Sequence, residues 1–233
     1  MDLSLLYFDY WYLVLVVPAV LLSLWAQIKV KTTFSKYSSV PVRCGMTGAA
    51  ASRYIQNANG IATGLEPVSG SLTDRFDPSS NTIRLSSPVF GQASIAAVGV
   101  AAHETGHALQ HAHGYAPVKL RTAMVPVTNF ASSLSPILVL VGIVLSMDAL
   151  AYLGVAFFGM ATLFQLVTLP VEFNASNRAV AALERSGYFT IDEIQGVKKV
   201  LTAAALTYVA ALFVSLMSFL RLILVVSGRG RRR

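Results

Sequence analysis

Four long apolar stretches alternate with polar segments along the chain. They run from Tyr10 to Ile28, within Thr122 to Met147, from Ala149 to Val171 and from Val200 to Leu220. Each stretch has the length of about 20 residues that a helix needs to cross a bilayer. Only Asp148 separates the second stretch from the third, so these two are expected to form a tight helical hairpin. Pro126 and Pro136 are expected to shorten or kink the first helix of that hairpin. The pattern therefore predicts a mainly α-helical, polytopic membrane protein with about four transmembrane helices.

The polar segment between the first two apolar stretches predicts a small α/β unit with a short β-hairpin. Thr47 is a suitable N-cap for a helix over Gly48–Ala58. Strands are expected at Gly70–Phe76 and Thr82–Ser86, because the residues between them are rich in turn formers. A further helix is expected over Gln92–Ala112. Its apolar part is too short to cross a bilayer, so it is predicted to be a buried core helix.

These stretches divide the chain into five predicted regions. Residues 1–28 form the first transmembrane helix, and residues 29–122 form the α/β region. Residues 123–171 form the transmembrane hairpin, residues 172–199 a helical segment, and residues 200–233 the last transmembrane helix with a basic tail. The capping-box spacing of Thr190 and Glu193 predicts a helix start that leads into the fourth apolar stretch.

Composition supports a membrane protein. The 233 residues are 55% hydrophobic and 12% charged, with a mean hydropathy of +0.61, whereas soluble domains carry about 25% charged residues. The net charge of +7 raises the possibility of nucleic-acid binding. No basic stripe with interleaved aromatic residues is present, so a nucleic-acid partner is not expected. The basic residues instead flank the apolar stretches, where they set orientation in the lipid bilayer.

The positive charges predict which side of the membrane each segment occupies. The loops Lys29–Arg121 and Glu172–Lys199 hold thirteen of the eighteen Lys and Arg residues. Both loops are therefore expected in the cytoplasm and both termini outside. The arginines of the tail (Arg229, Arg231, Arg232 and Arg233) argue against that arrangement, and a fourth segment lying on the membrane surface would remove the conflict. Four spans remain the preferred reading. Asp2 and Asp9 give no positive n-region, so the first stretch is expected to be a retained span rather than a signal peptide.

Cys44 is the single cysteine, so no intrachain disulfide can form. Beside Pro41 and Gly45, it is predicted to be a small packed residue rather than a nucleophile.

All four histidines fall within eleven residues, and two of them belong to the sequence His103-Glu104-Thr105-Gly106-His107. On a helix, positions i and i+4 lie on one face about 6 Å apart, so both imidazoles can reach one tetrahedral Zn²⁺. Glu104 is rotated about 100° from His103 and lies beside the metal rather than on it. It can therefore act as general base toward a water molecule whose pKa the metal lowers toward 7.

Catalytic zinc takes a third protein ligand, for which three residues compete. His111 lies about 12 Å along the helix from His103, which is too far for a shared metal. His113 has the spacing of the third metzincin ligand. The metzincin pattern has a glycine that turns the chain back toward the metal, whereas this sequence has Gln110 at that position. Glu172 follows the third apolar stretch, where a carboxylate is costly unless it binds metal or pairs, for instance with Arg178. The hairpin returns the chain to the same side, so Glu172 is the predicted ligand.

Several segments together resemble the bacterial membrane-bound neutral zinc metallopeptidases of the YugP-like group. The resemblance runs through Leu72–Pro78, Arg84–Ser86, Ser94–Val98, Ala102–Gln110, Val171–Ser176 and Ala203–Ala211. The layout is also similar to the HtpX-type membrane proteases, in which a membrane hairpin separates the H-E-x-x-H motif from a glutamate ligand. Those proteins usually carry an aspartate four residues after that glutamate, whereas this chain has Ser176.

The resemblance implies a zincin-like domain at the cytoplasmic surface of a bacterial plasma membrane. His103, His107 and Glu172 would bind one Zn²⁺ per chain, and Glu104 would activate water to attack a peptide bond of a membrane-associated protein or peptide. Strand Thr82–Ser86 is expected to offer an edge to an extended substrate. The candidates for polarising the oxyanion are Arg178, Asn174 and Tyr115.

The alternative is a catalytically inactive membrane protein, either a metal-binding scaffold or a transporter. A transporter would place polar residues inside its spans, yet the apolar stretches hold no histidine and no charged residue. A scaffold could dispense with Glu104, which is present. The enzyme is therefore the preferred hypothesis.

Overall fold

A computed structural model describes residues 10–230 and divides the chain into two compact units. The first unit comprises Met1–Ala26, Lys119–Leu169 and Thr207–Arg233, and the second comprises Gln27–Val118 and Pro170–Leu206. Asp2, Asp9 and the arginines at positions 231–233, which entered the prediction of orientation, lie outside the described residues.

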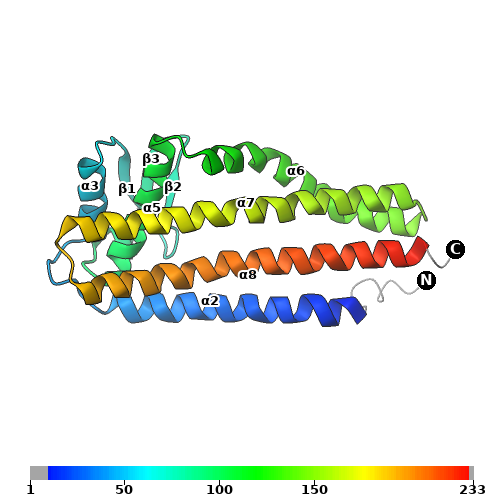
Figure 1. Cartoon of the computed structure of the whole chain (residues 1–233), viewed down its shortest axis with the longest axis horizontal. Helices are drawn as coiled ribbons and strands as arrows, with labels where there is room; N and C mark the ends of the chain where they lie inside the picture. Colours follow the sequence, from blue (N-terminus) through cyan, green and yellow to red (C-terminus); the bar gives the residue numbers. More distant parts are fainter. Residues whose placement is uncertain (1–9, 231–233) are drawn as a thin grey trace. The chain divides into compact units, whose positions relative to one another are not determined.

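Four long helices account for the apolar stretches (Figure 1). A π-helical turn at Tyr12–Val16 leads into α2 (Val17–Ser38), and α6 (Ala116–Val144), α7 (Asp148–Ser186) and α8 (Ile191–Gly230) follow the polar region. By length and composition all four are able to cross a membrane. The prediction of four such helices in a mainly α-helical protein with a short β-sheet is confirmed.

Close packing of small residues forms the hairpin of α6 and α7 in the first unit. A Cβ added to Gly142 would lie 2.4 Å from the backbone nitrogen of Ala151, so only glycine allows this approach. The hydroxyl of Ser135 donates to the carbonyl of Gly154 across the same contact. Pro126 and Pro136 lie inside α6, which continues past both.

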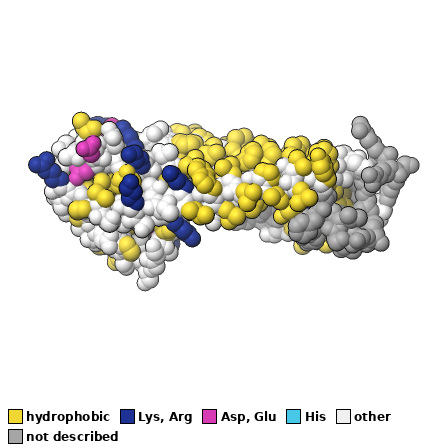
Figure 2. Space-filling view, turned by 90° about the horizontal axis from the view of Figure 1, so that it is seen from below, with side chains coloured by type: hydrophobic (Ala, Val, Ile, Leu, Met, Phe, Trp, Pro, Cys, Tyr) yellow, Lys and Arg dark blue, Asp and Glu magenta, His cyan; other side chains and the backbone are white. Residues whose placement is uncertain are grey.

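Large apolar side chains lie on the outside of the first unit. Leu13, Phe130, Leu145 and Leu166 are each more than half exposed. In Figure 2, hydrophobic side chains gather along the long helices. Such a surface is unfavourable in water and suits contact with lipid.

A three-stranded sheet covers one side of helix α5 in the second unit. Its strands are β1 (Gly64–Val68), β2 (Arg75–Asp77) and β3 (Thr82–Ser86), in the order β1-β3-β2. Strand β1 pairs parallel to β3, with Leu65 opposite Ile83, and β2 pairs antiparallel to β3. Buried Ile83 and Leu85 pack against α5 (Ile95–Ala112) together with Val89 of the short helix α4 (Ser87–Gly91).

The other side of α5 packs on helices. Val98, Ala102 and Leu109 join a buried cluster with Ile55 of α3 (Gly48–Ala58) and with residues of α7 and α8. Because α5 is covered on both sides, its residues 95–102 are almost all buried. The prediction that this segment is a core helix rather than a span is confirmed.

Several local predictions are confirmed and others need correction. Thr47 caps α3 by accepting from the backbone N–H of Ala50, and Thr190 and Glu193 form a reciprocal capping box at the start of α8. The strand expected at Gly70–Phe76 begins only at Arg75, because the preceding loop places Leu72 at a φ of 58°. Helix α5 begins at Ile95 rather than at Gln92, since Ser94 caps it. Strand β1 and helix α4 were not predicted.

Cys44 also differs from its prediction as a small packed residue. It is exposed, because it lies in a turn at Val42–Gly45 in which Gly45 has a φ of 68°.

Candidate metal centre

Helix α5 supplies two histidines and a glutamate to one side of the second unit. The hydroxyl of Ser94 accepts from the N–H of Ala97 and fixes the start of the helix. The rings of His103 and His107, one turn apart, have centroids 4.7 Å from each other. Both side chains are mostly buried, with 14% of their surface exposed.

Helix α7 brings Glu172 between the two imidazoles. Its Oε2 atom lies 3.4 Å from Nε2 of His103 and 3.4 Å from Nε2 of His107. Ligands bound at 2.0–2.1 Å around a tetrahedral zinc ion are about 3.4 Å apart. Both distances to Glu172 therefore fit a zinc ion, and the ligand atoms of the three residues all lie within 4.8 Å of one another. Imidazole nitrogens and a carboxylate oxygen are also ligands that zinc takes in proteins.

A glycine allows the two helices to approach at this point. A Cβ added to Gly106 would lie 2.5 Å from the carbonyl oxygen of Ala175 in α7. Any other residue would separate the helices, because a real Cβ never comes so close to backbone. Gly106 stands between the two histidines of the motif, and Ala175 stands one turn after Glu172. The glycine thus sets the distance between the two halves of the candidate site.

Each histidine has a hydrogen-bond partner on the ring nitrogen that faces away from Glu172. Nδ1 of His103 lies 3.1 Å from Oγ of Ser176, and Nδ1 of His107 lies 3.0 Å from Oε1 of Gln110. With Nδ1 as the donor in both, the lone pair of each Nε2 is directed to the position between the ligands. Such partners fix the tautomer and orientation of metal-binding histidines. Ser176, four residues after Glu172, thus contacts His103 from α7.

Gln110 joins α5 to α7 and was not predicted to have this role. Its amide nitrogen donates to the carbonyl of Val171 and to Oδ1 of Asn174. The side chain is fully buried, so all its polar groups are used within the protein. The signal in the sequence is its spacing of three residues from His107, which places both on one helical face.

Glu104 lies beside the donor atoms and is held by the sheet. Its Oε2 atom accepts a hydrogen bond of 2.9 Å from the backbone N–H of Phe76 in β2. The side chain is nearly buried. The sequence gives no sign of this contact, because a backbone N–H is available at almost every residue.

Two aspartates fix the hairpin that carries Phe76. Asp74 accepts from the backbone N–H and the hydroxyl of Ser86. Burial raises the pKa of Asp74, although these hydrogen bonds act in the opposite direction. The hydroxyl of Ser79 and the guanidinium of Arg84 hold the pKa of Asp77 well below its usual range. Asp77 is therefore ionised at neutral pH and ties the turn to β3.

The other candidates for the third ligand lie elsewhere. His111 is exposed, with its ring 5.6 Å from that of Phe76. His113 is also exposed, and its Nδ1 accepts from the guanidinium of Arg178 at 3.1 Å. Nε of Arg178 donates to Asn174 at 2.8 Å. In the described part of the chain, Arg178 makes these contacts rather than the ion pair with Glu172 considered from the sequence.

The three oxyanion candidates lie in one cluster. Arg178 is bonded to Asn174, and its guanidinium carbon is 5.7 Å from the ring centre of Tyr115. Gln110 connects Asn174 to His107, so a chain of hydrogen bonds leads from the cluster to a candidate ligand.

The expectation that strand Thr82–Ser86 offers an edge to a substrate is wrong. This strand is β3, which lies in the centre of the sheet and pairs on both sides. The edges are β1 and β2, and β2 is the strand whose backbone contacts Glu104.

Comparison with known proteins gives two matches. Residues 12–227 match a family described as "Putative neutral zinc metallopeptidase". The chain is 48% identical over 220 residues to the Bacillus subtilis (strain 168) protein named "Putative membrane protease YugP", and the match covers 94% of this chain and 98% of that protein. No solved structure matches this chain.

Proposed function

Because the chain belongs to the neutral zinc metallopeptidase family, we propose that it is a membrane-embedded zinc endopeptidase with His103, His107 and Glu172 as metal ligands. The observation that carries the proposal is the meeting of three donor atoms from two helices, with the Glu172 oxygen at the distance from both histidine nitrogens that a tetrahedral zinc ion requires. One Zn²⁺ per chain is expected.

Glu104 is assigned as the general base. A bound zinc ion supplies Lewis-acid polarisation and lowers the pKa of water. Glu104 directly follows His103 on α5 and lies beside the proposed ligands. Its carboxylate accepts the proton of the attacking water and then gives it to the leaving amine. The N–H of Phe76 holds one carboxylate oxygen, so the side chain is oriented before substrate arrives. Nearly complete burial excludes bulk water from the base.

The cluster around Arg178 is assigned to the oxyanion. Arg178 carries a full positive charge, and the amide of Asn174 and the ring of Tyr115 fix its position. A preoriented charge stabilises a developing oxyanion more than a mobile one, because it does not reorganise during the reaction.

Strand β2 is the proposed site for the substrate backbone. It is an edge strand, and its Phe76 contacts the base. An extended peptide added to this edge would form main-chain hydrogen bonds independent of sequence. Its scissile bond would then lie near Glu104.

We assign the site to the cytoplasmic side of a bacterial plasma membrane. The two loops that contribute its residues hold thirteen of the eighteen positive residues. Glu172 directly follows an apolar stretch, so the substrates are expected to be membrane proteins or peptides close to the membrane surface.

A paired assay of zinc content and proteolysis tests this function. Purified Glu104→Gln should keep about one zinc per chain, because Glu104 is not a ligand. Its kcat on a fluorogenic casein substrate should fall about 10²–10⁴-fold, because an amide cannot accept the proton. Glu66→Gln is the matched control, since Glu66 is an exposed carboxylate on β1, and it should retain wild-type activity.

Two results would contradict the proposal. Cleavage by Glu104→Gln at the wild-type rate would exclude Glu104 as the base. Zinc-loaded wild type that cleaves no protein or peptide substrate would favour the non-catalytic scaffold.

A further inference from the structure

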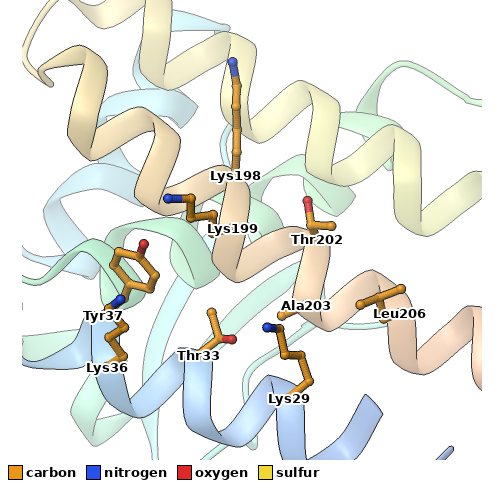
Figure 3. A pocket seen from close by; sticks show the side chains of 9 residues that line it. All are labelled: Lys29, Thr33, Lys36, Tyr37, Lys198, Lys199, Thr202, Ala203 and Leu206. Carbon is orange, nitrogen blue, oxygen red and sulfur yellow. The ribbon is translucent and has the colours of Figure 1, made fainter. Parts of the chain in front are cut away.

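An open pocket of about 390 Å³ lies between α2 and α8 in the second unit (Figure 3). Lys29, Thr33 and Lys36 line it from α2, at a spacing of three to four residues that places them on one helical face. Lys199 and Thr202 line it from α8. The remaining lining residues are Tyr37, Lys198, Ala203 and Leu206. The volume is within the usual range for sites that bind small molecules.

The side chains that line this pocket carry positive charge. Four lysines line it, and no lining residue is acidic. Lys198 extends away from α2 in Figure 3 and pairs with Glu184 at 2.8 Å. Within residues 10–230, Lys29, Lys36 and Lys199 form no ion pair with a carboxylate. Three ammonium groups with hydroxyl donors beside them select an anion with several acceptor oxygens, such as a phosphate group.

One end of the pocket is closed by helix packing. A Cβ added to Gly196 would lie 3.0 Å from Cε1 of Tyr37 and 2.9 Å from Cγ2 of Ile95. Helices α2 and α8 therefore touch at Gly196 and Tyr37, next to Lys36 and Lys199. Ala203 and Leu206 line the pocket farther along α8, and Lys29 of α2 lies beside them in Figure 3. The pocket thus combines charged and apolar side chains along about 12 Å of helix.

The position of the lysines in the sequence indicates the source of the phosphate. Lys29 directly follows the apolar stretch Tyr10–Ile28, and Lys199 directly precedes the apolar stretch Val200–Leu220. Both residues therefore lie where the apolar part of a helix ends, which is the level of lipid headgroups. Leu206 belongs to the apolar stretch itself, at the level of acyl chains.

We propose that this pocket binds the phosphate of an anionic phospholipid, with Lys29, Lys36 and Lys199 around the phosphate and Leu206 against the acyl chain. The proposal is independent of peptidase activity, because none of these residues belongs to the candidate metal centre. A bound lipid would hold α2 to α8 by charge at a place where the two helices otherwise face each other with like charges.

Native mass spectrometry of the full chain in detergent tests the proposal. Phosphatidylglycerol should bind more tightly than phosphatidylcholine, because only the headgroup of phosphatidylglycerol carries a net negative charge. The double variant Lys29→Gln with Lys199→Gln should weaken binding of phosphatidylglycerol about 30-fold, since each lysine near a lipid surface contributes about 1 kcal/mol. Lys29→Arg with Lys199→Arg should stay within about threefold of wild type, because the charge is kept.

The control removes the same charge outside the pocket. Lys31→Gln with Lys119→Gln should leave the affinity for phosphatidylglycerol within about threefold of wild type, since both lysines are exposed and neither lines the pocket. Thermal unfolding of each variant in detergent reports whether it has folded. Equal weakening by the two Lys→Gln pairs, or equal binding of phosphatidylcholine, would overturn the proposal. Displacement of the lipid by an equal concentration of inorganic phosphate would assign the pocket to free phosphate instead.

Discussion

At the scale of residues, the contacts of their Nδ1 atoms orient the two histidines of the candidate metal centre. Ser176 approaches His103 from α7, and Gln110 approaches His107 from one turn farther along α5. Both contacts leave Nε2 facing Glu172. Similar metal sites often use a carboxylate for this purpose. A hydroxyl and an amide keep the orientation without adding a second negative charge beside Glu172.

Ser176→Ala should weaken zinc binding about 10–100-fold, because His103 loses the partner that fixes its tautomer. Ser176→Asp should bind zinc at least as tightly as wild type, since a carboxylate accepts from Nδ1 as well. Competition with a coloured zinc chelator measures both affinities. Ser35→Ala, on an exposed part of α2, is the control. An unchanged affinity in Ser176→Ala would show that the contact does not orient His103.

The residues that repeat with a fixed spacing were predictable from the sequence, and those joined across the chain were not. The His103 and His107 pair follows from the helical period alone. Glu172 followed from the cost of a carboxylate at the end of an apolar stretch. The contact of Gln110 with Asn174 joins residues 64 positions apart, and that of Phe76 with Glu104 joins residues 28 positions apart. Such contacts depend on the packing of α5 against α7 and the sheet.

At the scale of elements, the close approach of α5 and α7 controls the candidate metal centre. Gly106 allows it, because its missing Cβ leaves room for the carbonyl of Ala175. Two of the proposed ligands come from α5 and the third from α7. A change of a few tenths of an ångström between these helices therefore alters the ligand set as a whole.

Gly106→Ala should destabilise the protein by about 1–3 kcal/mol, because the added methyl group overpacks the contact. It should also reduce zinc content, since Glu172 moves away from the histidines. Thermal unfolding in detergent and elemental analysis measure the two effects. Gly91→Ala is the matched control, because an added Cβ there meets nothing within 4 Å. If Gly106→Ala kept the zinc content and stability of wild type, the candidate metal centre would tolerate a separation of α5 and α7.

The capped and periodic elements were predicted well, and the short sheet was predicted in part. Thr47 and Thr190 marked true helix starts. Strand β1 has the sequence Gly-Leu-Glu-Pro-Val, whose Gly64 and Pro67 are unfavourable in strands. It forms because parallel pairing with buried β3 supplies hydrogen bonds, and its position at an edge tolerates proline. Tertiary pairing of this kind has no signal in the local sequence.

At the scale of the whole molecule, the topology is predicted from four apolar helices and two positively charged loops. The loops contain every residue assigned to the site. The tip of the α6–α7 hairpin, around Met147, is expected on the opposite side of the membrane.

Cysteine labelling tests this topology in intact cells. Cys44, which is exposed, and cysteines introduced as Ala112→Cys and Ser186→Cys should resist an impermeant thiol reagent. Met147→Cys in a Cys44→Ser background should react readily, because Met147 is exposed at the hairpin tip. Labelling of the first group with protection of Met147→Cys would place the site outside the cell.

Zinc affinity of two ligand variants tests the central claim most directly. Glu172→Ala should lose more than about 100-fold in affinity and lose proteolysis with it, because a ligand costs more than an orienting residue. His113→Ala should bind zinc like wild type, since His113 contacts Arg178 rather than the metal group. Chelator competition on the two purified variants gives both values. A large loss in His113→Ala with an unchanged Glu172→Ala would contradict the account and move the third ligand to His113.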